Sequence, residues 1–241
     1  MIYRGAVVLL LAAGLSPASR AGDPWKDKSC SDWNMADTTK VLAHSPWVKD
    51  ARVAAPWVKG QPVSLFPMLG GCGGRMDPDE RPPALDAGPS FQSMIVYRVS
   101  WISGRTYREA KARRQVLCGE MEQEDLESNV EQGVAEDYVL YIESPDMTPF
   151  DGSDESTIQK NSLLIGKKSG LKLSPSSVQL RQAGGSRIFG VIFHFPKATD
   201  DGKPVVVPGE TELALSYKFG KIEIKAKFLP DKMMRAGAAD L

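Results

Sequence analysis

Residues 213–228 read LALSYKFGKIEIKAKF, and this stretch decides the fold class. On each side of Gly220-Lys221, apolar side chains alternate with other residues, which is typical of a half-buried strand. Glycine as the first residue of a two-residue loop favours a type II′ turn. Residues 211–229 are therefore predicted to form an antiparallel hairpin.

Further strands are predicted upstream of this hairpin. Residues 187–195 and residues 91–103 each place a row of apolar side chains on one face. The two rows are Phe189, Val191, Phe193 and Phe195, and Phe91, Ile95, Tyr97, Val99 and Trp101. Shorter strands are expected over residues 138–143, 171–173 and 178–180.

Two helices are expected between these strands. One covers residues 105–128, with apolar side chains at helical spacing, and a shorter one covers residues 154–165. The elements follow the order strand, helix, strand, helix and then mostly strands. This order predicts an α+β domain over residues 91–241, with a largely antiparallel sheet and the two helices packed on one face.

The longer predicted helix has an unusual order of charges. Basic residues from Arg105 to Arg114 come first, and acidic residues from Glu120 to Glu127 come last. This order opposes the helix dipole at both ends. It indicates either a polarised face that docks a partner or a solvated face with internal ion pairs. We favour the second interpretation, because exposed ion pairs form readily and contribute below about 1 kcal/mol each.

Two segments precede the domain. Residues 22–60 form an N-terminal helical or irregular segment, with a short helix over residues 37–44 that Pro46 ends. Residues 61–90 are rich in Gly and Pro and are predicted to be a flexible, disordered linker. Three Pro-Trp pairs in the first segment supply candidate partner-docking residues, namely Trp25, Trp47 and Trp57. The alternative, which we favour, is that these tryptophans anchor the segment to the main domain.

The chain begins with a predicted signal peptide, residues 1–21. Arg4 is followed by a run of small and apolar residues over 5–15, which is too short to span a bilayer. The pattern of small residues predicts cleavage after Ala21, and cleavage after Ala18 is the alternative. The mature chain is expected to be soluble, without a transmembrane segment, and periplasmic or extracellular.

The charge balance argues against two classes of partner. The chain has 30 basic and 30 acidic residues, and loss of Arg4 and Arg20 with the signal peptide leaves 28 basic residues and a formal charge of −2. A balanced charge of this kind provides no footprint for nucleic acid or for an anionic membrane surface.

The three cysteines, Cys30, Cys72 and Cys118, allow at most one intramolecular disulfide. Cys72 lies among four glycines, so pairing of Cys72 with Cys30 is feasible at a modest cost in loop-closure entropy. No Cys-x-x-Cys sequence occurs, so neither a zinc knuckle nor a dithiol redox motif is expected.

Several short motifs together resemble those of a known family. They are Leu42-Ala43-His44-Ser45-Pro46-Trp47, Gly70–Gly74, Trp101-Ile102-Ser103, Arg108-Glu109-Ala110, Phe195-Pro196-Lys197 and the segment Lys227–Met234. The chain resembles an uncharacterised family of exported acidobacterial-type proteins. That family has a Leu-x-x-Ser-Pro-Trp helix end, a glycine-rich linker and a C-terminal phenylalanine-to-methionine motif. The resemblance covers most of the mature chain and implies this layout, without an assigned activity.

Motifs for catalysis or metal binding are weak. Neither His44 nor His194 has a second ligand at metal-binding spacing. Residues 166–170, Gly-Lys-Lys-Ser-Gly, lack the spacing of a phosphate loop. The acidic loop over residues 146–155 carries four carboxylates that suit calcium, but we favour a solvated turn that caps the second helix. No cofactor is expected.

These observations favour a noncatalytic binding or scaffold module of the cell envelope. Its partner would be an unknown envelope protein or a cell-wall component. The alternative is a secreted hydrolase that uses two carboxylates, as in glycoside hydrolysis, although the sequence does not locate such a pair.

Overall fold

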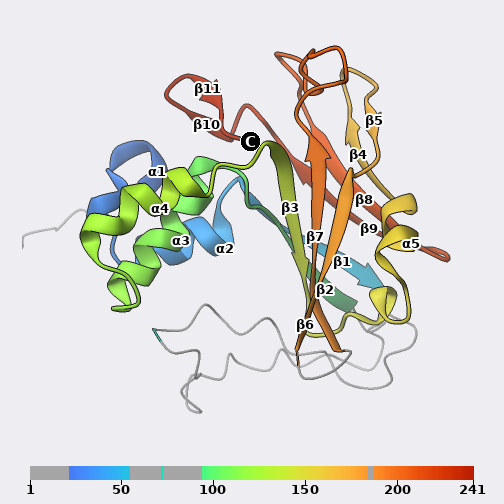
Figure 1. The fold of residues 1–241 in the computed structure, drawn as a ribbon, viewed down its shortest axis with the longest axis horizontal. Helices are drawn as coiled ribbons and strands as arrows, with labels where there is room; N and C mark the ends of the chain where they lie inside the picture. Colours follow the sequence, from blue (N-terminus) through green and yellow to red (C-terminus); the bar gives the residue numbers. More distant parts are fainter. Residues whose placement is uncertain (1–21, 55–71, 73–93, 184–186) are drawn as a thin grey trace, which may run out of the picture.

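A computed structural model describes residues 22–54, 72, 94–183 and 187–241. Its main elements are two antiparallel sheets, one of five strands in the order β1-β2-β3-β7-β6 and one of four strands in the order β5-β4-β8-β9 (Figure 1). Their strands are β1 Val48–Ala54, β2 Met94–Trp101, β3 Asp137–Glu143, β4 Ser162–Gly166, β5 Lys172–Leu173, β6 Ser177–Ala183, β7 Arg187–Pro196, β8 Leu213–Phe219 and β9 Ile222–Phe228. A small C-terminal pair consists of β10 Met234–Arg235 and β11 Ala238–Ala239.

Most helices gather on one side of the five-stranded sheet (Figure 1). The helices are α1 Pro24–Asp27, α2 Met35–His44, α3 Arg105–Leu117, α4 Leu126–Gln132 and α5 Glu155–Lys160, with short 3₁₀ turns at Cys30–Asp32, Gln123–Asp125 and Thr148–Phe150. Helix α2 packs on α3 through Leu42 and Ala110, and α4 packs on α3 through Val130 and Ala112. Helix α5 lies apart from them, against the edge strand β6.

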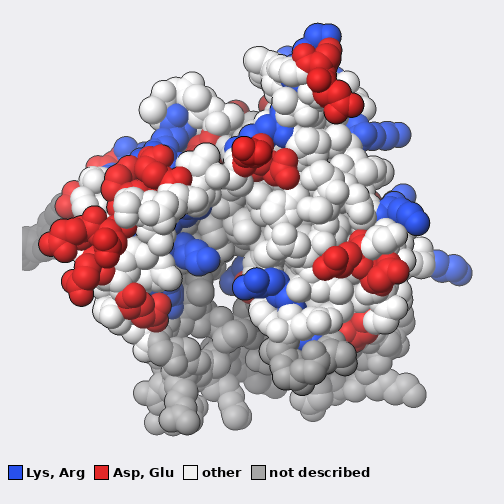
Figure 2. Space-filling model, in the orientation of Figure 1, with Lys and Arg blue, Asp and Glu red and all other residues white. Residues whose placement is uncertain are grey.

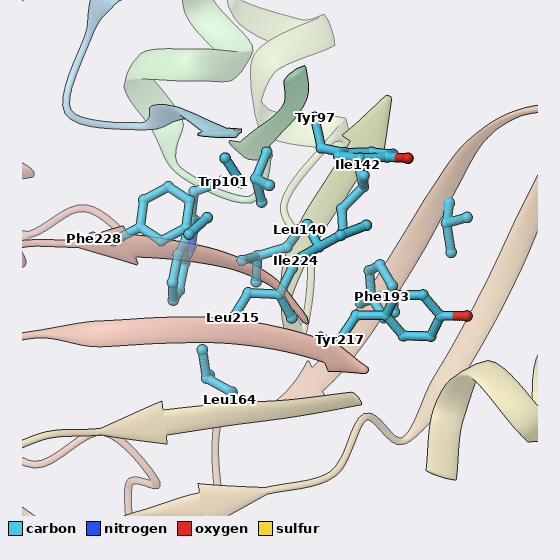
Figure 3. Packing of buried hydrophobic residues seen from close by; sticks show 14 of the residues in the cluster. Tyr97, Trp101, Leu140, Ile142, Leu164, Phe193, Leu215, Tyr217, Ile224 and Phe228 are labelled. Carbon is cyan, nitrogen blue, oxygen red and sulfur yellow. The ribbon is translucent and has the colours of Figure 1, made fainter. Parts of the chain in front are cut away.

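The core lies between the two sheets (Figure 3). The rings of Trp101 from β2 and Phe228 from β9 meet edge to face at 5.2 Å between centroids. The ring of Tyr217 from β8 stacks on Phe150 at 4.4 Å. The predicted α+β class with antiparallel sheets is confirmed. The alternating apolar face of the β8–β9 hairpin covers the inner face of the five-stranded sheet, so α3 and α4 are left to cover part of the outer face.

The predicted hairpin is present in the expected register. Phe219 pairs with Ile222 across the loop Gly220-Lys221. Gly220 has a φ of +57°, and Ala236 is the only described non-glycine residue with a positive φ, so Lys221 has a negative φ. This combination is that of a type II′ turn.

Strand β1 lies within the segment that was expected to be helical or irregular. It pairs antiparallel with β2, with Val48 opposite Ser100 and Ala54 opposite Met94. Val48, Ala51 and Val53 are buried, and Lys49 and Asp50 are more exposed. Residues 48–54 are thus an edge strand of the main sheet.

The expectation of one helix over residues 105–128 was wrong, because the chain forms two helices there. Helix α3 ends at Leu117, and Gly119 follows with a φ of +69° and donates its N–H to the carbonyl of Val116 at 3.0 Å. Glycine in this left-handed conformation is a common helix end. The acidic residues therefore lie in the following turn and in α4, and they do not oppose the dipole at the end of α3.

Two further details differ from the sequence prediction. The second predicted helix ends at Lys160, and residues 162–166 form β4, which pairs with β8. Phe189 was expected on the buried face of β7, but it is 42% exposed. A bulge pairs Arg181 with Gly190 and the next residue of β6 with Ile188, so Phe189 is left without a partner and turns outward.

The predicted Cys30–Cys72 disulfide was also wrong. Cys72 is bonded to Cys118, with 5.0 Å between their Cα atoms, and Cys30 is free. Cys30 is half-buried against the helix contacts around Ala110 and Ala112, whereas Cys118 lies at the end of α3. Burial raises the pKa of the Cys30 thiol. Loop-closure entropy differs little between the two pairings, so only the tertiary structure distinguishes them.

Candidate functional site

A cavity of about 610 Å³ lies between the helices and the outer face of the five-stranded sheet. We call it the helix–sheet cleft. Its volume is within the range of about 300–1,000 Å³ that is typical of small-molecule sites. It is lined by Ile102, Tyr107, Arg108, Lys111, Gln115, Asn129, Gly133, Tyr141, Arg181, Phe189 and Ile192. Figure 2 shows a hollow between the helical part and the sheet, with basic side chains on both of its sides.

The floor of the helix–sheet cleft is formed by the sheet. The ring of Tyr141 from β3 lies across Gly190 of β7, where an added Cβ would come within 2.3 Å of the ring and of the hydroxyl. Any side chain at position 190 would therefore displace Tyr141. Ile192 follows two residues later on the same face of β7 and adds an apolar surface.

One wall of the cleft is α3. Tyr107 and Lys111 are four residues apart, so they lie on the same face of the helix. Arg108 donates hydrogen bonds to the carbonyl of Ser103, at 3.3 Å, and to the carbonyl of Val130. The guanidinium of Arg108 thus ties α3 to α4. Lys111 forms no such hydrogen bond to another described residue.

The opposite wall contributes Arg181, which lies on β6 and pairs with Gly190 in the register. Neither Lys111 nor Arg181 forms an ion pair with another residue in the described part of the chain. No Asp or Glu is among the described residues that line the cleft. Two exposed cations therefore line one concave site, and no carboxylate of the described residues lines it with them.

The tyrosines of the cleft keep their protons at neutral pH. Burial raises the pKa of Tyr141, and the neighbouring carboxylate of Glu143 raises it further, whereas Arg181 acts in the opposite direction. Burial also raises the pKa of Tyr107, whose hydroxyl is hydrogen-bonded to Ser100. Both rings therefore offer an uncharged, partly apolar surface with a polar tip.

A second cavity, of about 720 Å³, lies beside the C-terminal tail. Its lining is mostly apolar and includes Val207, Pro208, Met234 and Leu241. Lys197 lies over the ring of Tyr138 at 5.6 Å and donates to the carbonyl of Ala135 at 2.9 Å, and burial lowers its pKa. The ammonium group of Lys197 is therefore held by contacts within the protein.

Glu210, at the rim of the second cavity, fills the loop that superficially resembles a phosphate loop. Its carboxylate accepts hydrogen bonds from the backbone N–H of Lys168 at 2.7 Å, from that of Ser169 at 3.0 Å and from the Ser169 hydroxyl at 2.6 Å. Burial acts to raise the pKa of Glu210, but these bonds and that from the N–H of Thr211 outweigh it and lower the pKa to about 2. The amides of residues 168 and 169 are thus occupied by an internal anion.

Of the three candidate docking tryptophans, Trp47 is not accessible to a partner. Trp47 is completely buried and donates its indole N–H to the carbonyl of Asp240 at 2.6 Å, so its role as a docking residue is corrected to that of an anchor. Trp25 is partly buried and meets Trp47 edge to face at 5.9 Å. Trp57 and the cleavage position after Ala21 lie outside the described residues.

The histidines remain apart. His44 is exposed at the end of α2. His194 lies 3.8 Å from Asp137, and the hydroxyl of Ser176 is 3.4 Å from the same carboxylate. That hydroxyl bonds the backbone carbonyl of His194 at 3.1 Å and not its imidazole. A nucleophile needs contact with its base, so this arrangement lacks the geometry of a serine triad.

The acidic loop acts as a set of local caps. Asp146 accepts from the N–H of Thr148 at 2.8 Å, and Asp154 accepts from the N–H of Thr157 at 2.6 Å at the start of α5. These contacts agree with the favoured interpretation of this loop. Among the described residues, no group of three or more His, Cys, Asp or Glu side chains is placed to hold a metal ion.

Sequence reasoning did not identify the residues of the helix–sheet cleft. Lys111 was counted with the charges of its helix, and Tyr141 and Arg181 were strand residues without a motif. The one feature of the sequence that could point to the cleft is that its strands carry polar residues on their outer face. Most strands at a protein surface share this feature, so it does not identify a site. Tyr141 and Arg181 line the same cleft only because of the order of the strands in the sheet.

No helix in the described part of the chain is both long and apolar enough to cross a membrane. Comparison of the chain with protein-family models, with curated proteins and with solved structures found no match.

Proposed function

We propose that this protein is an exported, noncatalytic binding module of the cell envelope, and that the helix–sheet cleft is its ligand site. The observation that carries the proposal is the pair of unpaired cations, Lys111 and Arg181, on opposite walls of a cavity of about 610 Å³. A concave site with an apolar floor and a few convergent polar groups is the usual form of a small-ligand site.

The carboxylates that line the second cavity support binding there rather than hydrolysis. The alternative, a secreted hydrolase, needs one carboxyl that can donate a proton and a second that faces it across the substrate. In the second cavity, Glu210 has a pKa of about 2 and its oxygens are bonded to the loop, so it is a poor proton donor near neutral pH. Asp231, the other acid there, is exposed and paired with Lys232 at 3.3 Å.

The family resemblance belongs to the same proposal. Three of its motifs, at residues 42–47, 101–103 and 108–110, occur where the helices join the sheets, whereas most of the glycine-rich motif lies outside the described residues. Trp47 and Trp101 are buried, and the Ser103 hydroxyl accepts from the N–H of Val139 at 3.0 Å. Glu109 is buried and bonded to Arg105 at 3.0 Å and to Arg235. We therefore propose that proteins with these motifs have the same junction between helices and sheets.

The binding proposal is tested on the mature chain, residues 22–241, with a panel of sugar acids, sugar phosphates, aromatic acids, short peptides and neutral sugars. We expect at least one compound to raise the melting temperature and to be recovered chemically unchanged by mass spectrometry. The variant N129W should lose this rise, because Asn129 is exposed on the wall of the cleft and a larger side chain would fill the cavity. Circular dichroism of N129W provides the control for folding. Release of cleavage products from the panel would contradict the proposal.

Export is tested separately. The protein is expressed from the full chain, and the mature form is recovered from the periplasm or medium. N-terminal sequencing is expected to begin at Gly22. Recovery of the chain only in the cytoplasm, with Met1 retained, would contradict export without affecting the proposed ligand site.

A further inference from the structure

We infer that the ligand of the helix–sheet cleft is a small ring compound that carries one acid group. The acid group pairs with Lys111 and Arg181, and the ring lies on the floor made by Tyr141 and Ile192. This inference rests on the proposed function, because it assigns the chemistry of the ligand to the same site.

The charge of the cleft favours an anion. Lys111 and Arg181 are exposed and have no acidic partner among the described residues, so a carboxylate or phosphate between them would gain charge-assisted contacts. Arg181 offers a planar fork of donors that matches either acid group, and Lys111 supplies a second positive charge from the facing wall. The third basic residue, Arg108, is held by two backbone carbonyls and serves as a fixed background charge.

The floor of the cleft favours a ligand with an apolar ring. Gly190 has no side chain, so the ring and hydroxyl of Tyr141 occupy the space beside it on the floor of the cleft. Tyr107 and the outward-turned Phe189 add aromatic surface on the two walls. An aromatic ring, or the apolar face of a sugar ring, buries against such a surface.

The small number of unpaired basic residues at the cleft favours a small ligand over a polymer. Glu127 and Glu131 of α4 pair with Arg105, so the cations of this region that have no acidic partner are few. The whole chain has equal numbers of basic and acidic residues. A nucleic acid would need a longer row of unpaired cations along its backbone.

The test compares acids with their neutral counterparts. Glucuronate and glucose 6-phosphate are compared with glucose, and benzoate is compared with benzyl alcohol. Affinity is measured by calorimetry, and the site is located from amide chemical shifts in NMR spectra. We expect at least one acid to bind at least about tenfold more tightly than its neutral counterpart, which corresponds to about 1.4 kcal/mol. The sugar and aromatic pairs show which ring the floor accepts.

Three single-charge variants complete the test. K111Q and R181Q are each expected to weaken binding of the acid by about tenfold or more, because a charge-assisted hydrogen bond is lost. K225Q removes the same charge from an exposed position of β9 on the other sheet and is expected to leave the affinity within about twofold. All three should keep the melting temperature of the parent chain.

The outcomes separate the two proposals. Equal binding of acids and neutral counterparts, lost in N129W but unchanged in K111Q and R181Q, would overturn the anionic ligand and leave the cleft as a binding site. An absence of binding by every acid and every neutral counterpart would overturn both. Equal weakening in K225Q and K111Q would also overturn the inference, because it would indicate attraction by overall charge.

Discussion

Asp240 caps the helix that begins at Arg105. The two carboxylate oxygens of Asp240 accept hydrogen bonds from the backbone N–H of Arg105 at 2.5 Å and from that of Thr106 at 2.9 Å. The N-cap residue of α3 is Gly104, which has no side chain to supply this contact. The second-to-last residue of the chain thus provides the negative charge that the basic first turn of α3 lacks.

This cap predicts that the C-terminal tail stabilises the helical part. D240A should lower the free energy of unfolding by about 1–2 kcal/mol, because two N–H groups of the first turn lose their acceptor. D240N should lose less, because the amide oxygen still accepts one hydrogen bond. Urea unfolding followed by circular dichroism measures both. D231N, at an exposed acid of the same tail, is the control, and an equal loss in D231N would contradict the cap.

The second prediction concerns the pH dependence of Glu210. Its pKa in the folded protein is about 2, below the ordinary value of 4.5, so its hydrogen bonds stabilise the fold fully above pH 4.5. This contribution is lost as the pH falls from 4.5 towards 2, where the carboxylate takes up a proton. E210Q is therefore expected to be less stable by about 2 kcal/mol at pH 7, and its difference from the parent chain should shrink as the pH falls below 4.5.

Denaturant unfolding at a series of pH values measures the Glu210 effect. E136Q is the matched control, because Glu136 is exposed and its removal changes the charge by the same amount. A difference between E210Q and the parent that stays constant from pH 7 to pH 3 would show that the carboxylate is not the group that titrates.

The third prediction concerns the contact between Gly190 and Tyr141. G190A places a methyl group within 2.3 Å of the Tyr141 ring and is expected to cost about 1–3 kcal/mol of stability. It should also change the floor of the helix–sheet cleft and weaken binding of its ligand. In the double variant G190A/Y141A the ring is absent, so the two losses should not add. A double-mutant cycle from thermal unfolding measures this coupling, and strict additivity would contradict the contact.

The fourth prediction concerns the cysteines. Peptide mapping without reduction should find Cys72 joined to Cys118, and one cysteine, Cys30, should be labelled by a thiol reagent after denaturation. C30S should leave the disulfide intact, and C72S should lower stability by about 2–4 kcal/mol. Recovery of a peptide that joins Cys30 to Cys72 would contradict the pairing.

The charges of α3 could be interpreted only in part from the sequence. Arg105 bonds Glu109 at 3.0 Å and also bonds Glu127 and Glu131 of α4, so the favoured interpretation of internal ion pairs describes it well. Lys111 belongs to the same run but has no such partner among the described residues, and it lines the helix–sheet cleft. The sequence treats both as charges of one helix.

The sequence by itself determined the elements whose patterns are local. The alternation in β8 and β9, the glycine of their turn and the long apolar face of β2 are properties of neighbouring residues, so they specify strands and a hairpin wherever the chain folds. The capping box between Asn34 and Asp37 at the start of α2 is equally local.

The tertiary structure decided what depends on distant parts of the chain. The bulge that exposes Phe189, the choice of Cys118 as the partner of Cys72, and the cap from Asp240 each join residues that no spacing rule relates. The helix–sheet cleft has the same origin, because strand order brings Arg181 opposite Lys111. A pattern with a period of two or 3.6 residues encodes which face of an element is buried, but not which other element covers that face.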